Sequence, residues 1–408
     1  MKPEADVIVV GGGLNGPALA LALARAGLTV TVVDAQPARA RAEAAFDGRA
    51  YALAIASKRL LAAIGVWSRI EADSQPILQI KASDGRAGEG PSRHFLHFDS
   101  GEIEEGPMGF MVEDRALYAA FLAAMSETPG LTHIPATTVT AQAAGSAGIT
   151  VSLSDGRQLT ARMIAGCDGR ASATATRAGI ARTGKSYWQT ALVCAVAHVR
   201  PHLGIAQQFF MPTGPLAILP LTGNRSSIVW SETDANARAI AALDDAAFLE
   251  VLRPRFGDYL GAIRLAGPRF SYPLTLSLAN SYAAPRVALV GDAAHGVHPI
   301  AGQGLNLGFR DVAALAETLV AAARRGEDIG ALDVLERYQT WRRFDATTLA
   351  LGMDTVNRLF SNNNPILRVG RDLGLGLVNR AAPLRRAFMR QAAGLSGQLP
   401  KLLTGRPL

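Results

Sequence analysis

The pattern of apolar and polar positions predicts a strand, a turn and a helix at the start of the chain. Residues 7–10 form an unbroken run of valine and isoleucine, which is typical of a parallel strand buried on both faces. A glycine-rich turn follows at 11–16, and the alanine- and leucine-rich run 17–24 predicts a helix. Residues 28–33 are again apolar and β-branched, so we expect a second strand that ends at Asp34.

The turn has the spacing G-x-G-x-x-G, which is the fingerprint of dinucleotide binding when it joins a strand to a helix. Gly11 permits a tight turn, Gly13 lets a pyrophosphate approach the backbone, and Gly16 lets the helix pack closely on the strand. The carboxylate of Asp34 is placed to accept hydrogen bonds from a ribose. FAD and NAD use the same arrangement, so this segment leaves the choice between them open. The residues assigned here are Gly11, Gly13, Leu14, Asn15, Gly16 and Asp34.

A second segment of small residues, GDAAHGVHPIAGQGLN at 291–306, follows another apolar run that predicts a buried strand. Asp292 would be costly there as an uncompensated charge, so we expect it to meet a polyol or backbone donors. Gly302 and Gly304 let the chain pass close to a flat ring, and the helix expected from Asn306 onward presents its positive end there. Reduced flavin carries negative charge near its pyrimidine oxygen, so this segment favours FAD.

With both segments in place, the chain resembles the class A flavoprotein aromatic hydroxylases, and within them the hydroxylases of ubiquinone biosynthesis. In that family the G-D-A-A-H-x-x-x-P segment places its aspartate on the ribitol of FAD, which implies this role for Asp292. The resemblance extends to DGRAYALAIAS, GFMVEDRALYAAF and AGCDGRASATATRAGI, and implies cofactor contacts from Arg49, Arg115 and Asp168. The contacts that it implies in the second segment are Gly291, Asp292, Pro299, Gly302, Gly304, Leu305 and Asn306.

The third of these motifs departs from the family pattern. The family usually has an arginine three residues after the serine that corresponds to Ser172, whereas this chain has Ala175 there and Arg177 two positions on. The departure leaves the contact with the nicotinamide donor undetermined. Further on, RLFSNNNPILRVGRDLGLGLVNR is the feature most specific to the ubiquinone group.

The resemblance implies an α/β fold, in which a Rossmann-like FAD-binding domain carries an inserted, mainly antiparallel substrate domain and a C-terminal helical region follows. The sequence contains no second G-x-G-x-x-G, so the nicotinamide cofactor is expected to visit the flavin rather than to occupy its own domain. The expected division is 1–75, 102–178 and 273–350 for the FAD-binding domain, 76–101 and 179–272 for the substrate domain, and 351–408 for the C-terminal region.

The implied activity is that of an FAD-dependent monooxygenase. It would hydroxylate the aromatic ring of a polyprenylphenol-type intermediate with NADPH or NADH and O2, through a flavin hydroperoxide. The sequence singles out no catalytic base. Three alternatives stay open: a hydroxylase of another aromatic, a reductase of isoprenoid chains, and an FAD-bearing assembly subunit of a biosynthetic complex.

The positive charge of the chain is concentrated at its end. Residues 366–408 hold seven arginines and one lysine against one aspartate, which equals the whole net charge of +7. The remainder is therefore neutral, which argues against nucleic acid as a partner. Within this region we expect a basic amphipathic helix that docks on an anionic membrane or a partner complex, against the alternative of a solvated face on a packed helix. Its proposed arginines are Arg385, Arg386 and Arg390, and its proposed apolar face is Leu384, Phe388 and Met389.

Several other patterns are assigned ordinary structural roles. The uncharged run 7–24 contains glycines and a proline, which favours the strand, turn and helix over a membrane span, so a cytoplasmic protein, peripheral at most to the membrane, is expected. Residues 179–186, GIARTGKS, match a phosphate loop literally, but no buried strand precedes them and a strand-like run follows. The histidine pairs lack further metal ligands, and the two cysteines lie in apolar runs typical of packing.

Overall fold

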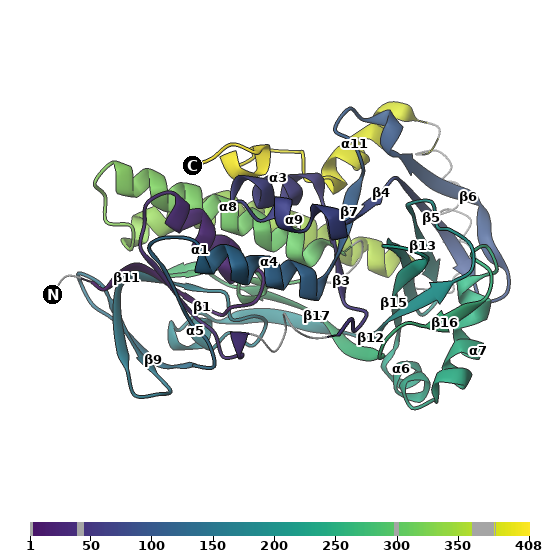
Figure 1. Ribbon diagram of the computed structural model, residues 1–408, viewed down its shortest axis with the longest axis horizontal. Coiled ribbons are helices and arrows are strands. Elements are labelled where there is room, and N and C mark those ends of the chain that lie inside the picture. The colour runs from purple at the N-terminus through teal and green to yellow at the C-terminus, as the bar shows by residue number, and fades with distance from the viewer. Residues whose placement is uncertain (1–2, 39–44, 298–301, 361–378, 380) are drawn as a thin grey trace.

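The computed structural model describes residues 3–38, 45–297, 302–360, 379 and 381–408 (Figure 1). It has a mixed α/β fold with one eight-stranded, one nine-stranded and one three-stranded sheet in the described chain. The eight-stranded sheet contains β1 (Ala5–Val10), β2 (Val30–Val33), β8 (Leu131–Ile134), β9 (Val139–Ala144), β10 (Ile149–Leu153), β11 (Gln158–Gly166), β18 (Ala283–Ala284) and β19 (Val287–Leu289).

The centre of this sheet is parallel. Strands β19, β11, β1, β2 and β8 lie side by side in that order and run in one direction. Because the carboxyl ends of parallel strands meet at one edge, the loops after β1, β2, β11 and β19 converge there. The glycine-rich turn, Asp34, the segment from Cys167 and the Gly291–Asp292 pair are therefore brought to the same edge from distant parts of the sequence.

The nine-stranded sheet is mainly antiparallel, with one parallel pair between β13 and β5. It occupies the right-hand half of the molecule in Figure 1. Its strands are β5 (Gln79–Arg86), β6 (Gly90–Asp99), β12 (Arg182–His198), β13 (Ile205–Met211), β14 (Gly214–Leu221), β15 (Arg225–Thr233), β16 (Ile263–Leu265), β17 (Phe270–Ala279) and β20 (His295–Gly296), and the small sheet is formed by β3 (Ala50–Leu53), β4 (Gln75–Ile77) and β7 (Gly109–Glu113).

Long helices run beside the parallel sheet, and α9 reaches across to the nine-stranded sheet (Figure 1). The α-helices are α1 (Asn15–Arg25), α3 (Ile55–Ala63), α4 (Asp114–Ser126), α5 (Ala173–Arg177), α6 (Asp234–Ala241), α7 (Asp245–Phe256), α8 (Gln303–Arg324), α9 (Leu332–Phe360) and α11 (Ala382–Ala392). Short 3-10 turns are η1 (Trp67–Arg69), η2 (Glu71–Asp73), η3 (Ser100–Glu102), η4 (Gly291–Ala293) and η6 (Lys401–Thr404). None of the helices in the described ranges is long and apolar enough to cross a membrane.

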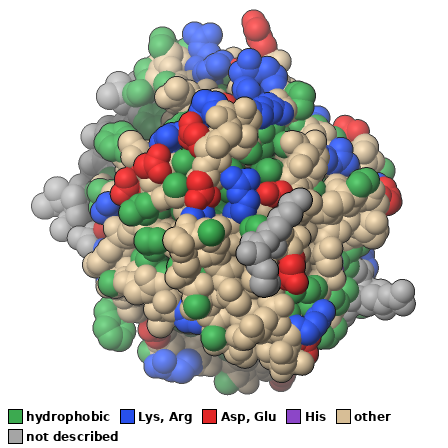
Figure 2. Space-filling model, turned by 90° about the vertical axis from the view of Figure 1, so that its left-hand side faces the viewer, with side chains coloured by type: hydrophobic (Ala, Val, Ile, Leu, Met, Phe, Trp, Pro, Cys, Tyr) green, Lys and Arg blue, Asp and Glu red, His purple; other side chains and the backbone are tan. Residues whose placement is uncertain are grey.

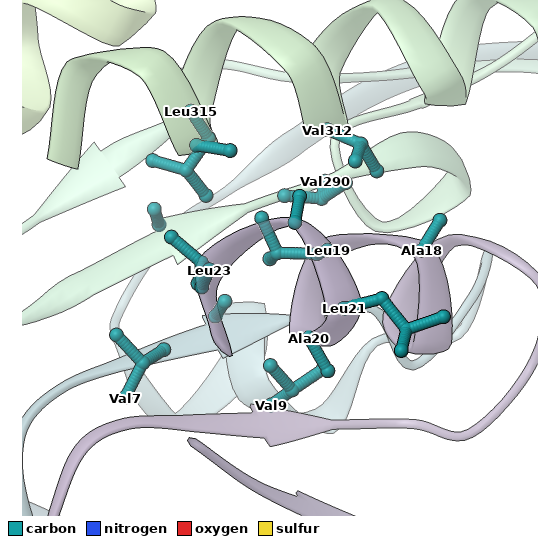
Figure 3. Close-up of a cluster of buried hydrophobic side chains, with 14 of the residues drawn as sticks. Val7, Val9, Ala18, Leu19, Ala20, Leu21, Leu23, Val290, Val312 and Leu315 are labelled. Atoms are coloured by element: carbon teal, nitrogen blue, oxygen red, sulfur yellow. The ribbon is translucent and has the colours of Figure 1, made fainter. Parts of the chain in front are cut away.

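The first helix explains why residues 7–24 carry no charge. Helix α1 is buried from Gly16 to Ala24, because it lies between β1 on one side and α8 on the other. Figure 3 shows Leu19 and Leu23 of α1 near Val312 and Leu315 of α8, with Val9 of β1 beneath the helix. A helix enclosed on all sides is apolar on all sides, so the strand–turn–helix interpretation of this run is confirmed.

Element boundaries differ slightly from those expected. Strand β2 begins at Val30 rather than Leu28, because Leu28 still belongs to the turn after α1. Helix α8 begins at Gln303, three residues before the expected Asn306, and its N-cap Gly302 has the left-handed backbone that glycine tolerates. The predicted strand after residue 186 is part of β12, which begins at Arg182 and so excludes the helix that a phosphate loop requires.

The C-terminal helix α11 exposes only part of its proposed docking surface. Met389 is fully buried against the small sheet, whereas Leu384 and Phe388 are 44% and 49% exposed. Arg385 pairs with Glu102 at 2.6 Å, and Arg390 pairs with Glu105 at 2.5 Å. Helix α11 is therefore anchored on the loop after β6, because the acidic residues of that loop neutralise two of its three arginines.

Candidate active site

A large cavity lies between the carboxyl edge of the parallel sheet and one face of the nine-stranded sheet. Its volume is about 1730 Å³, which exceeds the range of roughly 300–1,000 Å³ typical of small-molecule sites. Nine of the predicted site residues line it, and they come from four separate segments of the chain. These nine are Gly13, Leu14, Asn15, Arg49, Asp292, Gly302, Gly304, Leu305 and Asn306.

The glycine-rich turn leaves space for a ligand beside its backbone. Gly11 has a φ of +107°, and a Cβ there would lie 2.5 Å from the carbonyl oxygen of Cys167, so this position is restricted to glycine by the protein itself. At Gly13 a Cβ would meet no described atom within 4 Å, although this residue lines the cavity. The turn therefore fits a group that approaches Gly13 closely, as a pyrophosphate would.

Asn15 connects the first and the second predicted segment. Its side chain lies against Gly291 and Gly308, where an added Cβ would come within 2.2 Å and 2.5 Å of its Nδ2. Its Oδ1 is buried and accepts no hydrogen bond from the described residues. A buried acceptor without a donor is costly, and this atom is an unsatisfied polar group at the junction of the two segments.

Asp34 lies at the end of β2 and is buried, with 5% of its surface exposed. Tyr118 of α4 donates a hydrogen bond from its hydroxyl to Asp34 Oδ2 at 3.2 Å, and the backbone N–H of Gln36 donates to Oδ1 at 3.1 Å. The side chain also contacts the glycine-rich turn, since a Cβ on Gly12 would lie 2.2 Å from Oδ2. Asp34 is thus held beside the turn, as its proposed contact with a ribose requires.

The start of α8 presents backbone amides to the cavity. Residues 302–306 line it, and the N-cap residue Gly302 has no side chain that could cap this end of the helix. The Asn306 side chain is instead used within the protein. Its Oδ1 accepts hydrogen bonds from Ala54 N at 2.8 Å and Ser57 Oγ at 2.7 Å, so it fixes the end of α8 against α3. The exposed first-turn amides carry partial positive charge and suit an electron-rich ligand edge.

Asp292 is partly exposed and has a charged partner within the protein. Its side chain is 38% exposed and pairs with Arg170 Nε at 3.0 Å. The backbone of the same turn is held by Arg182, whose Nη2 donates to the carbonyl of Asp292 at 3.0 Å and whose Nη1 donates to that of Ala293. The charge of Asp292 is therefore compensated by an arginine at the cavity wall, and the turn keeps its shape through a second arginine.

A buried network of charged side chains lies beneath this turn. Asp311 of α8 is fully buried and accepts hydrogen bonds from Gly291 N at 3.0 Å and Arg342 Nε at 2.8 Å. Its carboxylate also contacts His295 Nε2 at 2.5 Å, and Asp345 pairs with Arg342 at 2.6 Å. Burial opposes ionisation of Asp311, but His295 and Arg342 outweigh it and hold the pKa of that carboxyl below its usual value. The network fixes Gly291 and thereby the position of Asp292.

Three further predicted residues lie in different relations to the cavity. Arg49 lines it and pairs with Asp47 at 2.7 Å. Arg115 lies outside the cavity lining, where it pairs with Glu113 at 2.9 Å. Asp168 also lies outside the lining, and its carboxylate accepts from the backbone N–H of Thr174 at 2.9 Å at the start of α5. The remaining predicted residues Gly11, Gly16, Asp34 and Gly291 also lie outside the lining, and Pro299 lies outside the described residues.

The structure shows the surroundings of Ala175, which stands where the family usually has an arginine in the third motif. Ala175 is fully buried in α5, so an arginine side chain would have no space at this position without rearrangement. Arg177 does not replace it, because its Nε donates to Gln142 Oε1 at 3.2 Å on the outer strand β9. Arg170 is the arginine of this motif that lines the cavity.

Sequence reasoning missed the two arginines that hold the Asp292 turn and the network around Asp311. Arg170 directly follows the Asp-Gly pair of its motif, which is a signal that could have been used. Asp311 also had a signal, since a charged pair at 310–311 interrupts an otherwise apolar helix. Nothing in the sequence around Arg182 indicates its contact with residues more than a hundred positions away.

The sequence patterns that resemble other kinds of functional site have ordinary structural surroundings in the described chain. Lys185 of the phosphate-loop match pairs with Asp354 of α9 at 2.6 Å. No group of three or more potential metal ligands occurs among the described residues. Cys194 is buried and unbridged, and burial raises the pKa of its thiol to about 12, so it stays protonated.

Comparisons with known proteins match most of the chain. Residues 4–350 match the family described as FAD binding domain. The chain is 47% identical over 407 residues to the ubiquinone hydroxylase UbiL of Rhodospirillum rubrum, covering 99% of this chain and 94% of that protein. It is 37% identical to 3-demethoxyubiquinol 3-hydroxylase of Escherichia coli, covering 96% and 98%. The structure of p-nitrophenol 4-monooxygenase PnpA from Pseudomonas putida is similar in fold, with a TM-score of 0.81, 20% identity and coverage of 98% and 100%.

Proposed function

The chain belongs to the FAD binding domain family and, within it, to the hydroxylases of ubiquinone biosynthesis, and from this premise we propose that it hydroxylates the ring of a polyprenylphenol. It is an FAD-dependent aromatic monooxygenase that uses NADPH or NADH and O2. The observation that carries the proposal is the large cavity in which the glycine-rich turn and the Asp292 turn meet a mainly apolar sheet face. Bound FAD supplies the transfer of one oxygen atom from O2 to the substrate ring.

The residues of the chain hold and surround the reacting groups. Gly13 and Asp34 contact the pyrophosphate and the ribose, Asp292 accepts hydrogen bonds from the ribitol, and the first amides of α8 stabilise negative charge on the flavin ring. The apolar walls exclude water from the site. This assignment is supported by the open space at Gly13 and by the uncapped end of α8 in the described chain.

Proton transfer in this site does not use a histidine or glutamate of the described lining. Asp292 is the one carboxylate among the described lining residues, and no histidine accompanies it. Tyr272 of β17 also lines the cavity, and burial raises the pKa of its phenol above the usual value. Tyr272 therefore stays protonated near neutral pH and acts as a hydrogen-bond donor to the substrate rather than as a base.

The division into domains and the location of the protein are parts of the same proposal. A Rossmann-like FAD-binding domain of residues 1–75, 102–178 and 273–350 is supported by the parallel centre of the eight-stranded sheet. A substrate domain of 76–101 and 179–272 is supported by the mainly antiparallel sheet. We place the protein in the cytoplasm.

Oxygen-dependent consumption of NADPH tests the function. The purified holoprotein is expected to oxidise NADPH faster when a polyprenylphenol is present, and mass spectrometry should detect the substrate with one added oxygen. Faster turnover with a small aromatic alone would favour a hydroxylase of another aromatic. Loss of a double bond from the isoprenoid side chain of the substrate would identify an isoprenoid reductase. NADPH oxidation that no phenol accelerates would support the assembly subunit.

Asp292→Ala is expected to weaken FAD binding by about 1–3 kcal/mol, the range of a charge-assisted hydrogen bond in a buried site. The reason is that the variant removes the proposed acceptor of the ribitol hydroxyls. Titration of the apoprotein with FAD measures the change. Asp155→Ala is the matched control, because it removes an exposed aspartate that pairs with Arg157 outside the cavity lining. Unchanged affinity in Asp292→Ala would refute the ribitol contact.

We also propose that α11 docks on an anionic membrane through Arg386 and the exposed Leu384 and Phe388. Arg386 has no ion pair among the described residues, and basic side chains near an anionic surface contribute about 1 kcal/mol each. The opposite end of the molecule is different, since positive and negative side chains are interspersed on its described surface (Figure 2).

The membrane contact is tested by co-sedimentation with anionic and neutral vesicles over a range of salt. Arg386→Gln is expected to bind anionic vesicles about threefold to tenfold more weakly, as the loss of about 1 kcal/mol implies. Arg157→Gln is the control at an exposed site on another face. Salt-insensitive binding that Arg386→Gln leaves unchanged would point to a partner protein instead.

A further inference from the structure

The floor of the cavity is a mainly apolar track that crosses the nine-stranded sheet, with Gln208 and Ser227 as its polar members. In the strand register, Val193 of β12 pairs with Val229, Val229 with Ala217, and Ala217 with Gln208. Gln208 of β13 pairs in turn with Ala82 of β5, and Ala82 with Leu96 of β6. All six side chains line the cavity, so the row extends without interruption from β12 to β6.

A second row runs beside the first on the same face of the sheet. Its members are two residues along each strand, which places them on the same side. Ala206 of β13 pairs with Ile80 of β5, and Ile80 with Phe98 of β6. Leu219 pairs with Ser227 at the β14–β15 end of the row. Six neighbouring strands are about 24 Å across at the usual spacing, so the track is much longer than an aromatic ring.

The two ends of the track differ in character. One end lies at β17 and the start of α8, where Arg49, Arg170 and Asp292 give a polar wall. The other end lies at α9 and α11, where Leu359 and Phe388 line the cavity while 41% and 49% of their surfaces are exposed. A side chain that both lines a cavity and meets solvent marks an opening, and here both side chains are apolar.

We propose that the alkyl tail of the substrate lies along this track and leaves the protein between α9 and α11. The inference rests on the proposed function, because it assumes a substrate whose ring reacts at the polar end. A tail that meets Ala82, Ala206 and Ala217 has room above these small side chains, and it exchanges water for apolar surface along its whole length. The polar end of the cavity then holds the aromatic ring, and the tail on the track orients the ring toward that end.

The proposal predicts how affinity depends on chain length. The holoprotein is titrated with a series of phenols that carry increasing numbers of isoprene units, and binding is measured by the change in flavin absorbance. Affinity is expected to increase with each added unit and then to become constant once the tail reaches Leu359 and Phe388. Affinity that does not depend on chain length would overturn the proposal, whether or not the phenols are hydroxylated.

Two kinds of variant locate the path. Ala82→Phe blocks the track at β5, the fifth of its six strands, and Leu359→Arg places a charge at the opening. Each is expected to weaken binding of the longest phenol at least tenfold relative to the phenol without a tail. Leu351→Arg is the matched control, because Leu351 is 55% exposed on the same helix and lies outside the cavity lining.

The experiments distinguish an incorrect route for the substrate tail from an incorrect proposed function. If the parent protein binds long phenols more tightly but does not hydroxylate them, the track stands and the proposed reaction is wrong. If the long phenols are hydroxylated and neither Ala82→Phe nor Leu359→Arg reduces the preference for a long tail, the tail follows another route. Equal losses in Leu359→Arg and Leu351→Arg would show a general effect of charge on α9 and would also refute the assigned opening.

Discussion

Gly13→Val is expected to lower the affinity for FAD by at least about 100-fold, or roughly 2.7 kcal/mol, while the apoprotein keeps its thermal stability. The added side chain meets no described atom within 4 Å of its Cβ, and Gly13 lies outside the left-handed region that would restrict it to glycine. The protein therefore tolerates the substitution, and the only group displaced is the proposed pyrophosphate. Fluorescence titration with FAD and thermal unfolding of the apoprotein measure the two quantities.

Gly145→Val is the matched control for this experiment. Gly145 also lies outside the left-handed region, and its Cβ would make an ordinary contact of 3.5 Å with the Gly148 carbonyl in the β9–β10 turn, away from the cavity. This variant should bind FAD as tightly as the parent. If Gly13→Val also binds FAD at the parent's affinity, the pyrophosphate does not pass over this turn, and the cofactor assignment of the glycine-rich segment fails.

The elements that the sequence predicted well are those whose pattern is set by local burial. From Val7 of β1 to Ala24 of α1 the chain carries no charge because the strand and the helix are buried, and the apolar run before Gly291 is the buried strand β19. The strand after residue 186 was recognised by its β-branched and aromatic residues, which distinguished it from the helix of a phosphate loop. Local composition predicts a strand or helix well when the whole element lies in one environment, such as the buried interior.

The partners of the site residues could not be predicted in the same way. Asp292 was expected to be compensated by a ligand or by backbone donors, yet Arg170 compensates it from 122 positions away. Arg182 donates a hydrogen bond to the carbonyl of Asp292, which lies 110 positions further along the chain. Asn306 accepts a hydrogen bond from the backbone N–H of Ala54, about 250 positions earlier. Such contacts depend on which loops the parallel sheet brings to one edge, and no local pattern in a single sequence records that arrangement.

The exposed charge of residues 366–408 could also be predicted only in part from the sequence. Counting residues located the excess of arginine in 366–408, but not the acidic residues that meet part of it. Glu102 and Glu105 lie in the loop after β6 and pair with Arg385 and Arg390. The net charge of a segment is therefore a poor measure of the charge that it exposes, because pairing is decided by the fold.

Asp311→Asn is expected to destabilise the folded protein by about 3–5 kcal/mol, the usual cost of removing one partner from a buried charged network. The variant leaves Arg342 buried with a single carboxylate, Asp345, and weakens the acceptor that holds Gly291 N and His295. In thermal unfolding this corresponds to a midpoint lowered by about 3–6 °C for a chain of this length. FAD affinity should fall as well, because Gly291 carries the turn of Asp292.

The pH dependence of this effect follows from the direction of the pKa shift. The pKa of Asp311 is lower in the folded protein than its ordinary value of about 3.9, so its stabilising contribution is complete above that value. The contribution is lost as the pH falls through the lower pKa of the folded state. The difference in midpoint between parent and variant should therefore be constant from neutral pH to about pH 5 and should decrease below about pH 4.

Asp155→Asn separates this network from a general effect of charge. It removes a carboxylate from an exposed ion pair, which is screened by solvent, and should leave the midpoint unchanged. A difference between parent and Asp311→Asn that grows as the pH falls would contradict the assigned sign, because it would require the carboxyl group of Asp311 to be protonated in the folded state. The folded protein would then hold the turn of Asp292 with a neutral hydrogen bond, and Arg342 would depend on Asp345 alone for its charge balance.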